Sequence, residues 1–114
     1  MTTKTAWLAG TSFYDSKLFI GCREFPKDMP LILEREPANP HDPNAVLVFL
    51  EAKELPDGTG FPKSQPRFKI GHVPAKDGTA AWLAQIMDAG KPVTAKFLRH
   101  GTGPGMQVEI SVDD

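Results

Sequence analysis

The sequence is poor in cysteine, in excess charge of either sign and in long apolar runs. Cys22 is the only cysteine among 114 residues, which excludes an intrachain disulfide and a zinc site built from several cysteines. A lone thiol without a disulfide framework favours a reducing, cytoplasmic setting. Lysine and arginine number 13 against 14 aspartates and glutamates, which excludes a polybasic protein that coats nucleic acid by bulk charge.

The apolar residues come in short stretches separated by 10 glycines and 11 prolines. The apolar patch at residues 7–9 is shorter than a signal-peptide core or a membrane span, so we predict a soluble protein without membrane contact. The length suits one domain over residues 1–114. Frequent turn residues between apolar runs are typical of short strands rather than of disorder.

Period-two alternation and short apolar runs predict about six strands. The cleanest alternation covers residues 106–112, and a glycine-rich turn joins it to the preceding run in a predicted hairpin. Gly71 lies inside another predicted strand and indicates a bulge, while alternation places Phe68, Ile70 and His72 on one face of that strand. The predicted strands cover residues 5–10, 31–36, 45–50, 67–73, 93–99 and 106–112, with a short strand or helical turn at 17–21.

One amphipathic helix is predicted over residues 77–89, where apolar residues recur at helical spacing from Ala80. Asp77 or Thr79 is suited to cap its start, and Gly90 to end it. Six short strands and one helix bury an apolar face best as a partly closed, OB-like or SH3-like β-barrel with the helix across an opening. The predicted core comprises Leu33, Val46, Val48, Ile70, Leu83, Met87, Val108 and Ile110.

Two stretches are predicted to be loops of unusual composition. Residues 51–66 are polar and rich in proline and glycine, so we expect an exposed loop there. The stretch from Arg35 to Ala45 reads Arg-Glu-Pro-Ala-Asn-Pro-His-Asp-Pro-Asn-Ala, and its prolines exclude a helix. Two interpretations of its polar side chains remain open. They bond to their own backbone and stabilise the turn, or they present donors and acceptors to a ligand.

Residues 34–48 closely resemble the central signature of the HIRAN domain family, Arg-Glu-Pro-x-Asn-Pro-x-Asp-x-Asn-Ala. The segment Lys-Ile-Gly-His-Val-Pro at 69–74 is similar to a strand of that family, and residues 80–90 are similar to its helix. Gly10 is followed by Phe13 and Tyr14 where the family has a glycine and two aromatic residues. The resemblance covers about residues 6–112.

This resemblance implies a small β-barrel that binds single-stranded DNA and recognises its 3′-hydroxyl end, in DNA repair or replication-fork processing. Phe13 and Tyr14 match residues that stack on the terminal bases. Asn39 and Asp42 match polar loop residues that contact the terminal nucleotide, with the Asp42 carboxylate near the 3′-hydroxyl.

Further residues extend the predicted site. His41 matches an aromatic position of the family, and His72 matches a residue that lines the phosphate path. Lysines and an arginine near these segments are candidates for phosphate contacts, with a solvated surface as the plain alternative. These are Lys69, Lys76, Lys96 and Arg99. The predicted nucleic-acid site comprises Phe13, Tyr14, Asn39, His41, Asp42, Lys69, His72 and Lys76.

A second function stays open at this stage, namely a non-enzymatic adaptor that uses the same barrel to bind a helicase or nuclease. The near-neutral net charge favours the adaptor, as do Ser12 and Ala75, which stand where a DNA-binding family member has basic residues. The aromatic pair and the polar loop favour DNA.

No catalytic arrangement is visible in the sequence. Cys22 has no base near it in the chain, and His41, Asp42, His72 and His100 lack the spacing of metal ligands. We therefore expect a monomeric binding module and no enzyme, cofactor or metal.

Overall fold

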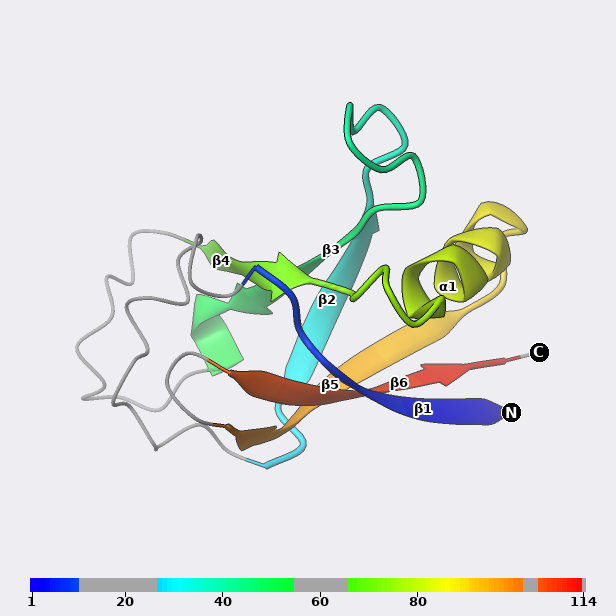
Figure 1. Cartoon of the computed structure of the whole chain (residues 1–114). Coiled ribbons are helices and arrows are strands. Elements are labelled where there is room, and N and C mark those ends of the chain that lie inside the picture. Colours follow the sequence, from blue (N-terminus) through cyan, green and yellow to red (C-terminus); the bar gives the residue numbers. More distant parts are fainter. Residues whose placement is uncertain (11–26, 55–65, 102–104, 114) are drawn as a thin grey trace.

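The computed structural model describes residues 1–10, 27–54, 66–101 and 105–113 (Figure 1). Within them, six strands form one antiparallel sheet in the order β1-β6-β5-β2-β3-β4, accompanied by one α-helix. The mainly β class with one helix is thus confirmed. The elements are β1 (Thr2–Trp7), β2 (Pro30–Arg35), β3 (Val46–Glu51), β4 (Arg67–His72), α1 (Thr79–Asp88), β5 (Val93–His100) and β6 (Met106–Val112).

The two edges of the sheet meet at Ala9 and His72. After β1, the Leu8 N–H still donates to the Met106 carbonyl at 2.9 Å. The next residue leaves β6: Ala9 and His72 exchange two backbone hydrogen bonds, of 2.8 and 3.0 Å. This isolated bridge curls the sheet towards β4 without a closed ladder, in agreement with the predicted partly closed barrel.

The core lies inside this curled sheet and confirms most of the predicted apolar faces. Every second residue of β6, from Met106 to Val112, is buried, as the alternation predicts. Six of the eight predicted core residues are fully or nearly fully buried. The exceptions are Leu33 and Met87, which are half-buried and pack against the edge of the core.

Several predicted boundaries differ from the structure. β1 begins at Thr2 and ends at Trp7 instead of covering residues 5–10. Its first residues are polar and carry no hydrophobic signal, and backbone pairing with β6 draws them into the sheet. Part of the predicted loop 51–66 is ordered, since β3 runs to Glu51 and a 3₁₀ turn follows at Ala52–Glu54. Residues 55–65, the predicted segment 17–21 and Cys22 lie outside the described residues.

Helix α1 starts two residues later than predicted, at Thr79. The N-cap residue is Gly78 and not Asp77 or Thr79, so the predicted side-chain cap is wrong. The Asp77 carboxylate still accepts a hydrogen bond from the Thr79 N–H at 3.0 Å, just before the first turn. Gly90 follows the helix with φ +76° and donates to the Met87 carbonyl at 3.0 Å, the left-handed ending that glycine permits. α1 lies beside the beginning of β3 (Figure 1). No helix in the described part of the chain has the length and apolar character that crossing a bilayer requires.

The pairing of β3 with β4 contains a β-bulge. Val48 and Phe49 are consecutive in β3, but their partners in β4 are Gly71 and Lys69, so Ile70 is the extra residue. The bulge that the sequence suggested at Gly71 is therefore present at its neighbour.

This bulge corrects the prediction that Phe68, Ile70 and His72 share one face. Phe68 and Ile70 are fully buried in the core. His72 instead lies opposite Leu47, which is not part of the core cluster, and its side chain is only half-buried. One inserted residue shifts the period-two pattern and turns His72 to the outer face of the sheet.

Candidate functional site

The connection between β2 and β3, residues 36–45 and hereafter the motif loop, is closed by its own backbone. The Glu36 N–H donates to the Ala45 carbonyl at 3.0 Å, and the Asn39 N–H to the Glu36 carbonyl at 3.1 Å. The Ala45 N–H donates to the Asp42 carbonyl at 3.1 Å. The motif loop stands away from the sheet in Figure 1, above β2 and β3. Its conformation is therefore fixed by local bonds and prolines rather than by the core.

Asn39 holds the motif loop together. Its Oδ1 accepts hydrogen bonds from the backbone N–H groups of His41, at 2.8 Å, and Asp42, at 3.1 Å. Its Nδ2 donates to Glu36 Oε1 at 2.8 Å. Both ends of the amide are thus engaged within the loop, which is the turn-stabilising arrangement that the sequence left open.

Asp42 retains acceptor capacity beyond its role in the turn. Its Oδ1 accepts from the Asn44 N–H at 2.9 Å. Its Oδ2 accepts no hydrogen bond from any residue that the structure describes, and the side chain is half-buried. An ionised carboxylate offers about four lone-pair sites, so Asp42 can accept from a ligand without leaving its turn.

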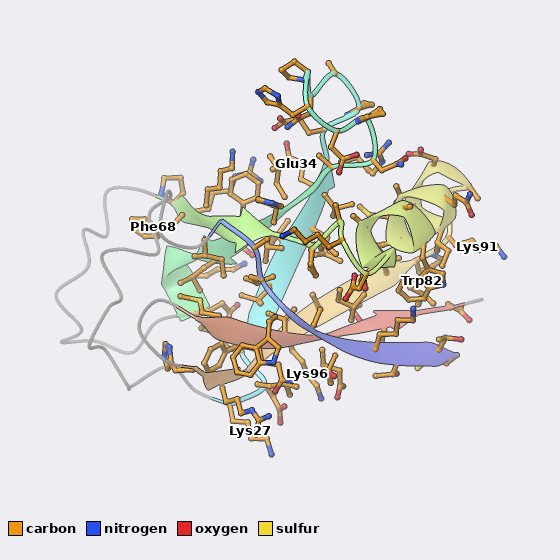
Figure 2. The ribbon with its side chains drawn as sticks, in the orientation of Figure 1. Lys27, Glu34, Phe68, Trp82, Lys91 and Lys96 are labelled. Carbon is orange, nitrogen blue, oxygen red and sulfur yellow. The ribbon has the colours of Figure 1, made fainter. Side chains whose placement is uncertain are left out.

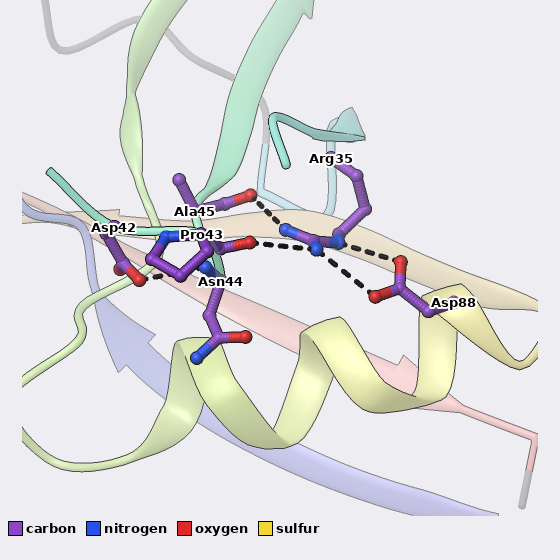
Figure 3. Close-up of polar contacts among 6 residues, drawn as sticks. All are labelled: Arg35, Asp42, Pro43, Asn44, Ala45 and Asp88. Atoms are coloured by element: carbon purple, nitrogen blue, oxygen red, sulfur yellow. Dashed lines mark hydrogen bonds and ion pairs between the residues drawn. The ribbon is translucent and has the colours of Figure 1, made fainter. Parts of the chain in front are cut away.

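Arg35 fastens the motif loop to the helix (Figure 3). Its guanidinium donates to the carbonyls of Ala45, at 2.8 Å, and Pro43, at 3.0 Å. It also makes a two-point contact with Asp88, at 2.9 and 3.1 Å. The hydrogen bonds to Asp88 raise the pKa of Arg35 and lower the pKa of the Asp88 carboxyl. The end of the motif loop is therefore held between β2 and the last turn of α1.

One pocket brings together residues of the motif loop and β4. Its volume is about 190 Å³. Four of the eight predicted site residues line it, three from the loop and one from the strand, together with two buried apolar side chains. The lining residues are Asn39, His41, Asp42, Ala45, Leu47 and His72.

The pKa of the His72 imidazole is lowered, which favours the uncharged form. Burial lowers its pKa from the ordinary value, the positive charge of Lys69 lowers it further, and the Asp42 carboxylate opposes both effects in part. A neutral imidazole offers one donor and one acceptor. The pocket thus combines the Asp42 carboxylate with the amide of Asn39, two imidazole rings and an apolar floor.

Two further predicted site residues that the structure describes, Lys69 and Lys76, do not line this pocket. Lys69 lies half-buried on β4, and Lys76 is exposed in the turn before α1. Phe13 and Tyr14 lie outside the described residues. Of the further cations considered for phosphate contact, Lys96 is paired with two carboxylates, at 3.4 Å each. Arg99 lies elsewhere on the sheet, on β5.

Three residues of this arrangement escaped the sequence analysis. Leu47 belongs to a run that predicts burial on both faces, and nothing in that run shows that the motif loop covers its outer face. Arg35 stands in the signature segment, so its position was a usable signal. Asp88 is 53 residues away from Arg35, and no pattern in the sequence indicated that the two are in contact. In the described part of the chain, no group of three or more histidine, cysteine, aspartate or glutamate side chains could hold a metal ion.

A family model described as "HIRAN domain" matches residues 6–112. The chain belongs to the HIRAN domain family. HIRAN domains are nucleic-acid-binding modules and not catalytic by themselves. The resemblance seen in the sequence is thereby confirmed.

Two crystal structures share the fold of this HIRAN domain. The HIRAN domain of human HLTF is 19% identical, with a TM-score of 0.62 over 96% of this chain and 74% of that one. A protein from Lactobacillus plantarum is 16% identical, with a TM-score of 0.67 over 96% of this chain and 93% of that one. At such identities the similarity shows the fold alone. Among curated proteins, none matches this sequence.

Proposed function

We propose that this HIRAN domain binds single-stranded DNA by its 3′-hydroxyl end, in the pocket between the motif loop and β4. The observation that carries the proposal is that Asp42 and His72, from separate elements, line one pocket of about 190 Å³. That volume is below the roughly 300–1,000 Å³ of small-molecule sites, so it suits the end of a chain better than a whole ligand.

Asp42 is the proposed reader of the terminal hydroxyl. A hydroxyl donates a hydrogen bond to the carboxylate, whereas a 3′-phosphate brings negative charge against negative charge. The two other loop residues have supporting roles. Asn39 fixes the backbone on which Asp42 sits, and His41 is exposed at the pocket rim, where its ring can pack on a nucleotide. Because the loop is ordered beforehand, little conformational entropy is lost on binding.

The remaining predicted residues supply sequence-independent affinity in this proposal. Phe13 and Tyr14 stack on terminal bases, and each stacking contact contributes roughly 1–3 kcal/mol. His72 donates to a phosphate oxygen, and Lys69 and Lys76 attract the backbone charge. The domain acts in DNA repair or replication-fork processing, with catalysis left to a helicase or nuclease partner.

Fluorescence anisotropy with 5′-labelled oligonucleotides that differ only in their 3′ end tests this function. We expect tighter binding of the 3′-hydroxyl than of the 3′-phosphate, and we expect Asp42→Asn to remove the difference. Asparagine keeps the acceptor for the Asn44 N–H, so the turn survives the change. Asp113→Asn is the matched control, because it removes the same charge from an exposed position just after β6.

Two results would contradict the proposal. Equal binding of both ends by the wild-type protein would exclude end recognition. Binding of neither, even at low salt concentration, would favour the adaptor function, because affinity from phosphate contacts rises as salt falls, with a slope of about −0.7 per phosphate for single strands.

A further inference from the structure

Trp7 is an exposed tryptophan on the outer face of β1. Its neighbours Ala6 and Leu8 are buried in the core, so the alternation of the strand directs Trp7 outwards. The residue is 45% exposed. A large aromatic side chain in this position is more informative than a scattered aliphatic one, because it leaves a broad apolar ring in water.

The ring of Trp7 is held in place by its neighbours across the sheet. Trp7 lies opposite Gln107 in β6, and Gln107 lies opposite Arg99 in β5. The Arg99 guanidinium is 5.7 Å from the centre of the indole ring. The edge of the ring also lies close to Gly101, where a Cβ atom would come within 2.6 Å of Trp7 Cζ3. The ring is therefore a positioned surface rather than a freely rotating side chain.

A groove of about 520 Å³ adjoins this ring and carries positive charge. Lys27 and Arg99 both line it, and both are exposed. Neither forms an ion pair with a carboxylate in the part of the chain that the structure describes, in contrast to nearby Lys96. Lys27 extends from the lower end of the molecule in Figure 2. Thr5, Gln107 and the apolar Leu98 form the rest of the lining, and the Thr5 hydroxyl and Gln107 amide can donate hydrogen bonds to an anion.

The outer face is continuous from Trp7 to the proposed end-binding pocket. Trp7 precedes Ala9 by two residues, which is roughly 7 Å along an extended strand. Ala9 in turn pairs directly with His72, which lines the pocket. Figure 1 shows the chain after β1 running across the sheet towards β4. A single DNA strand that runs from the pocket past Ala9 therefore reaches Trp7 within a short distance.

We propose that Trp7, Arg99 and Lys27 form a second contact for single-stranded DNA, hereafter the Trp7 platform. A base farther from the 3′ end stacks on the indole, and the two cations hold the adjacent phosphates. This inference rests on the proposed function, since the pocket can hold only the end of the strand. A stacking aromatic beside a cationic groove is the combination with which proteins bind single strands without reading their sequence.

Tryptophan fluorescence tests the platform directly, because the chain has only two tryptophans. Trp82→Phe leaves Trp7 as the single emitter, and Trp7→Phe leaves the half-buried Trp82. Each variant is titrated with a twelve-residue oligothymidylate that ends in a 3′-hydroxyl. We expect quenching of Trp7 emission that follows the binding curve from anisotropy, and no quenching in the Trp7→Phe protein.

Affinity measurements provide the second readout. Trp7→Ala should weaken binding of the twelve-mer by on the order of 5- to 150-fold while leaving a dinucleotide unaffected. Replacing Lys27 and Arg99 together by alanine should reduce the salt slope by about 1.4, or about 0.7 per phosphate contact. Lys91→Ala is the matched control, because Lys91 is an exposed lysine beyond the end of α1 (Figure 2).

The outcomes separate the platform from the end-binding pocket. Unchanged Trp7 emission together with a retained preference for 3′-hydroxyl ends would overturn the platform and leave the pocket intact. Quenching with equal binding of both ends would support the platform and contradict end recognition. Failure of the wild-type protein to bind any oligonucleotide would overturn both. In that last case, self-association that is lost in Trp7→Ala would identify Trp7 as a protein contact instead.

Discussion

Arg35 in β2 and Asp88 at the end of α1 form a two-point ion pair across 53 residues of sequence. The same guanidinium donates to the carbonyls of Pro43 and Ala45, so it connects the sheet, the helix and the motif loop. The position of Asp42 opposite His72 therefore depends on how α1 packs, although α1 itself does not line the pocket.

Arg35→Ala should destabilise the protein more than Asp88→Asn does. The arginine change leaves the Ala45 and Pro43 carbonyls without their charged donor, and such bonds contribute roughly 1.5–3 kcal/mol to the free energy of unfolding. Asp88 is 60% exposed, so water replaces its partner at little cost. Urea denaturation of both variants measures the difference, and equal losses would show that the ion pair, not the carbonyl bonds, holds the motif loop.

His72 should make the free energy of unfolding fall in mild acid. Its pKa is lowered in the folded protein by burial and by the charge of Lys69, whereas in the unfolded chain it titrates near 6.5. The folded state thus takes up the proton less readily. The contribution of His72 to the free energy of unfolding is therefore fully present above about pH 6.5. It decreases as the pH falls towards and through the folded pKa, and it does not change further below that pKa.

The contribution of His72 is isolated by comparing pH profiles of the wild type and His72→Gln between pH 7.5 and 4.5. Carboxylates such as Asp77, whose pKa is lowered by the bond to Thr79, also make the free energy of unfolding fall at lower pH. Their effect is the same in both proteins, so it cancels when one profile is subtracted from the other. Parallel profiles for the two proteins would be inconsistent with a lowered pKa of His72 in the folded state.

Gly71→Val should lower the melting temperature rather than only weaken binding. Gly71 is buried at the bulge and lies opposite Val48, a fully buried core residue. Added methyl groups on that face must enter a filled core, and such overpacking typically costs about 1–3 kcal/mol. Thermal unfolding of Gly71→Ala and Gly71→Val gives the comparison. A valine variant that melts at the wild-type temperature would contradict this packing.

Gly101→Ala should displace the ring of Trp7 while the fold is kept. The new Cβ would lie 2.6 Å from Trp7 Cζ3, so the indole has to move away. We expect an altered Trp7 emission in the Trp82→Phe background, weaker binding of long oligonucleotides and an almost unchanged melting temperature. Wild-type affinity for a twelve-mer, despite the altered emission, would argue against stacking on Trp7.

The local pattern was sufficient wherever one face of an element is apolar and the other polar. β6 begins and ends where its alternation predicts, and Gly90 ends α1 in the conformation that its position suggests. β1 was predicted less well because Thr2, Thr3 and Lys4 are polar, and only pairing with β6 shows that they belong to the sheet. The motif loop could be delimited from its prolines, and the resemblance of its signature identified the family.

Propensity, periodicity and turn chemistry are local properties. The sequence by itself therefore determined most of the strands, the helix and the family to which the chain belongs. It also showed that Asn39 is able to stabilise a turn. Contacts between distant segments were decided by the tertiary structure alone. The bulge at Ile70 turns His72 from the predicted core face to the pocket, because one extra residue reverses the alternation of a strand. Packing brings Arg35 to Asp88, and strand register brings Arg99 in β5 to the ring of Trp7 in β1. No local pattern encodes either contact.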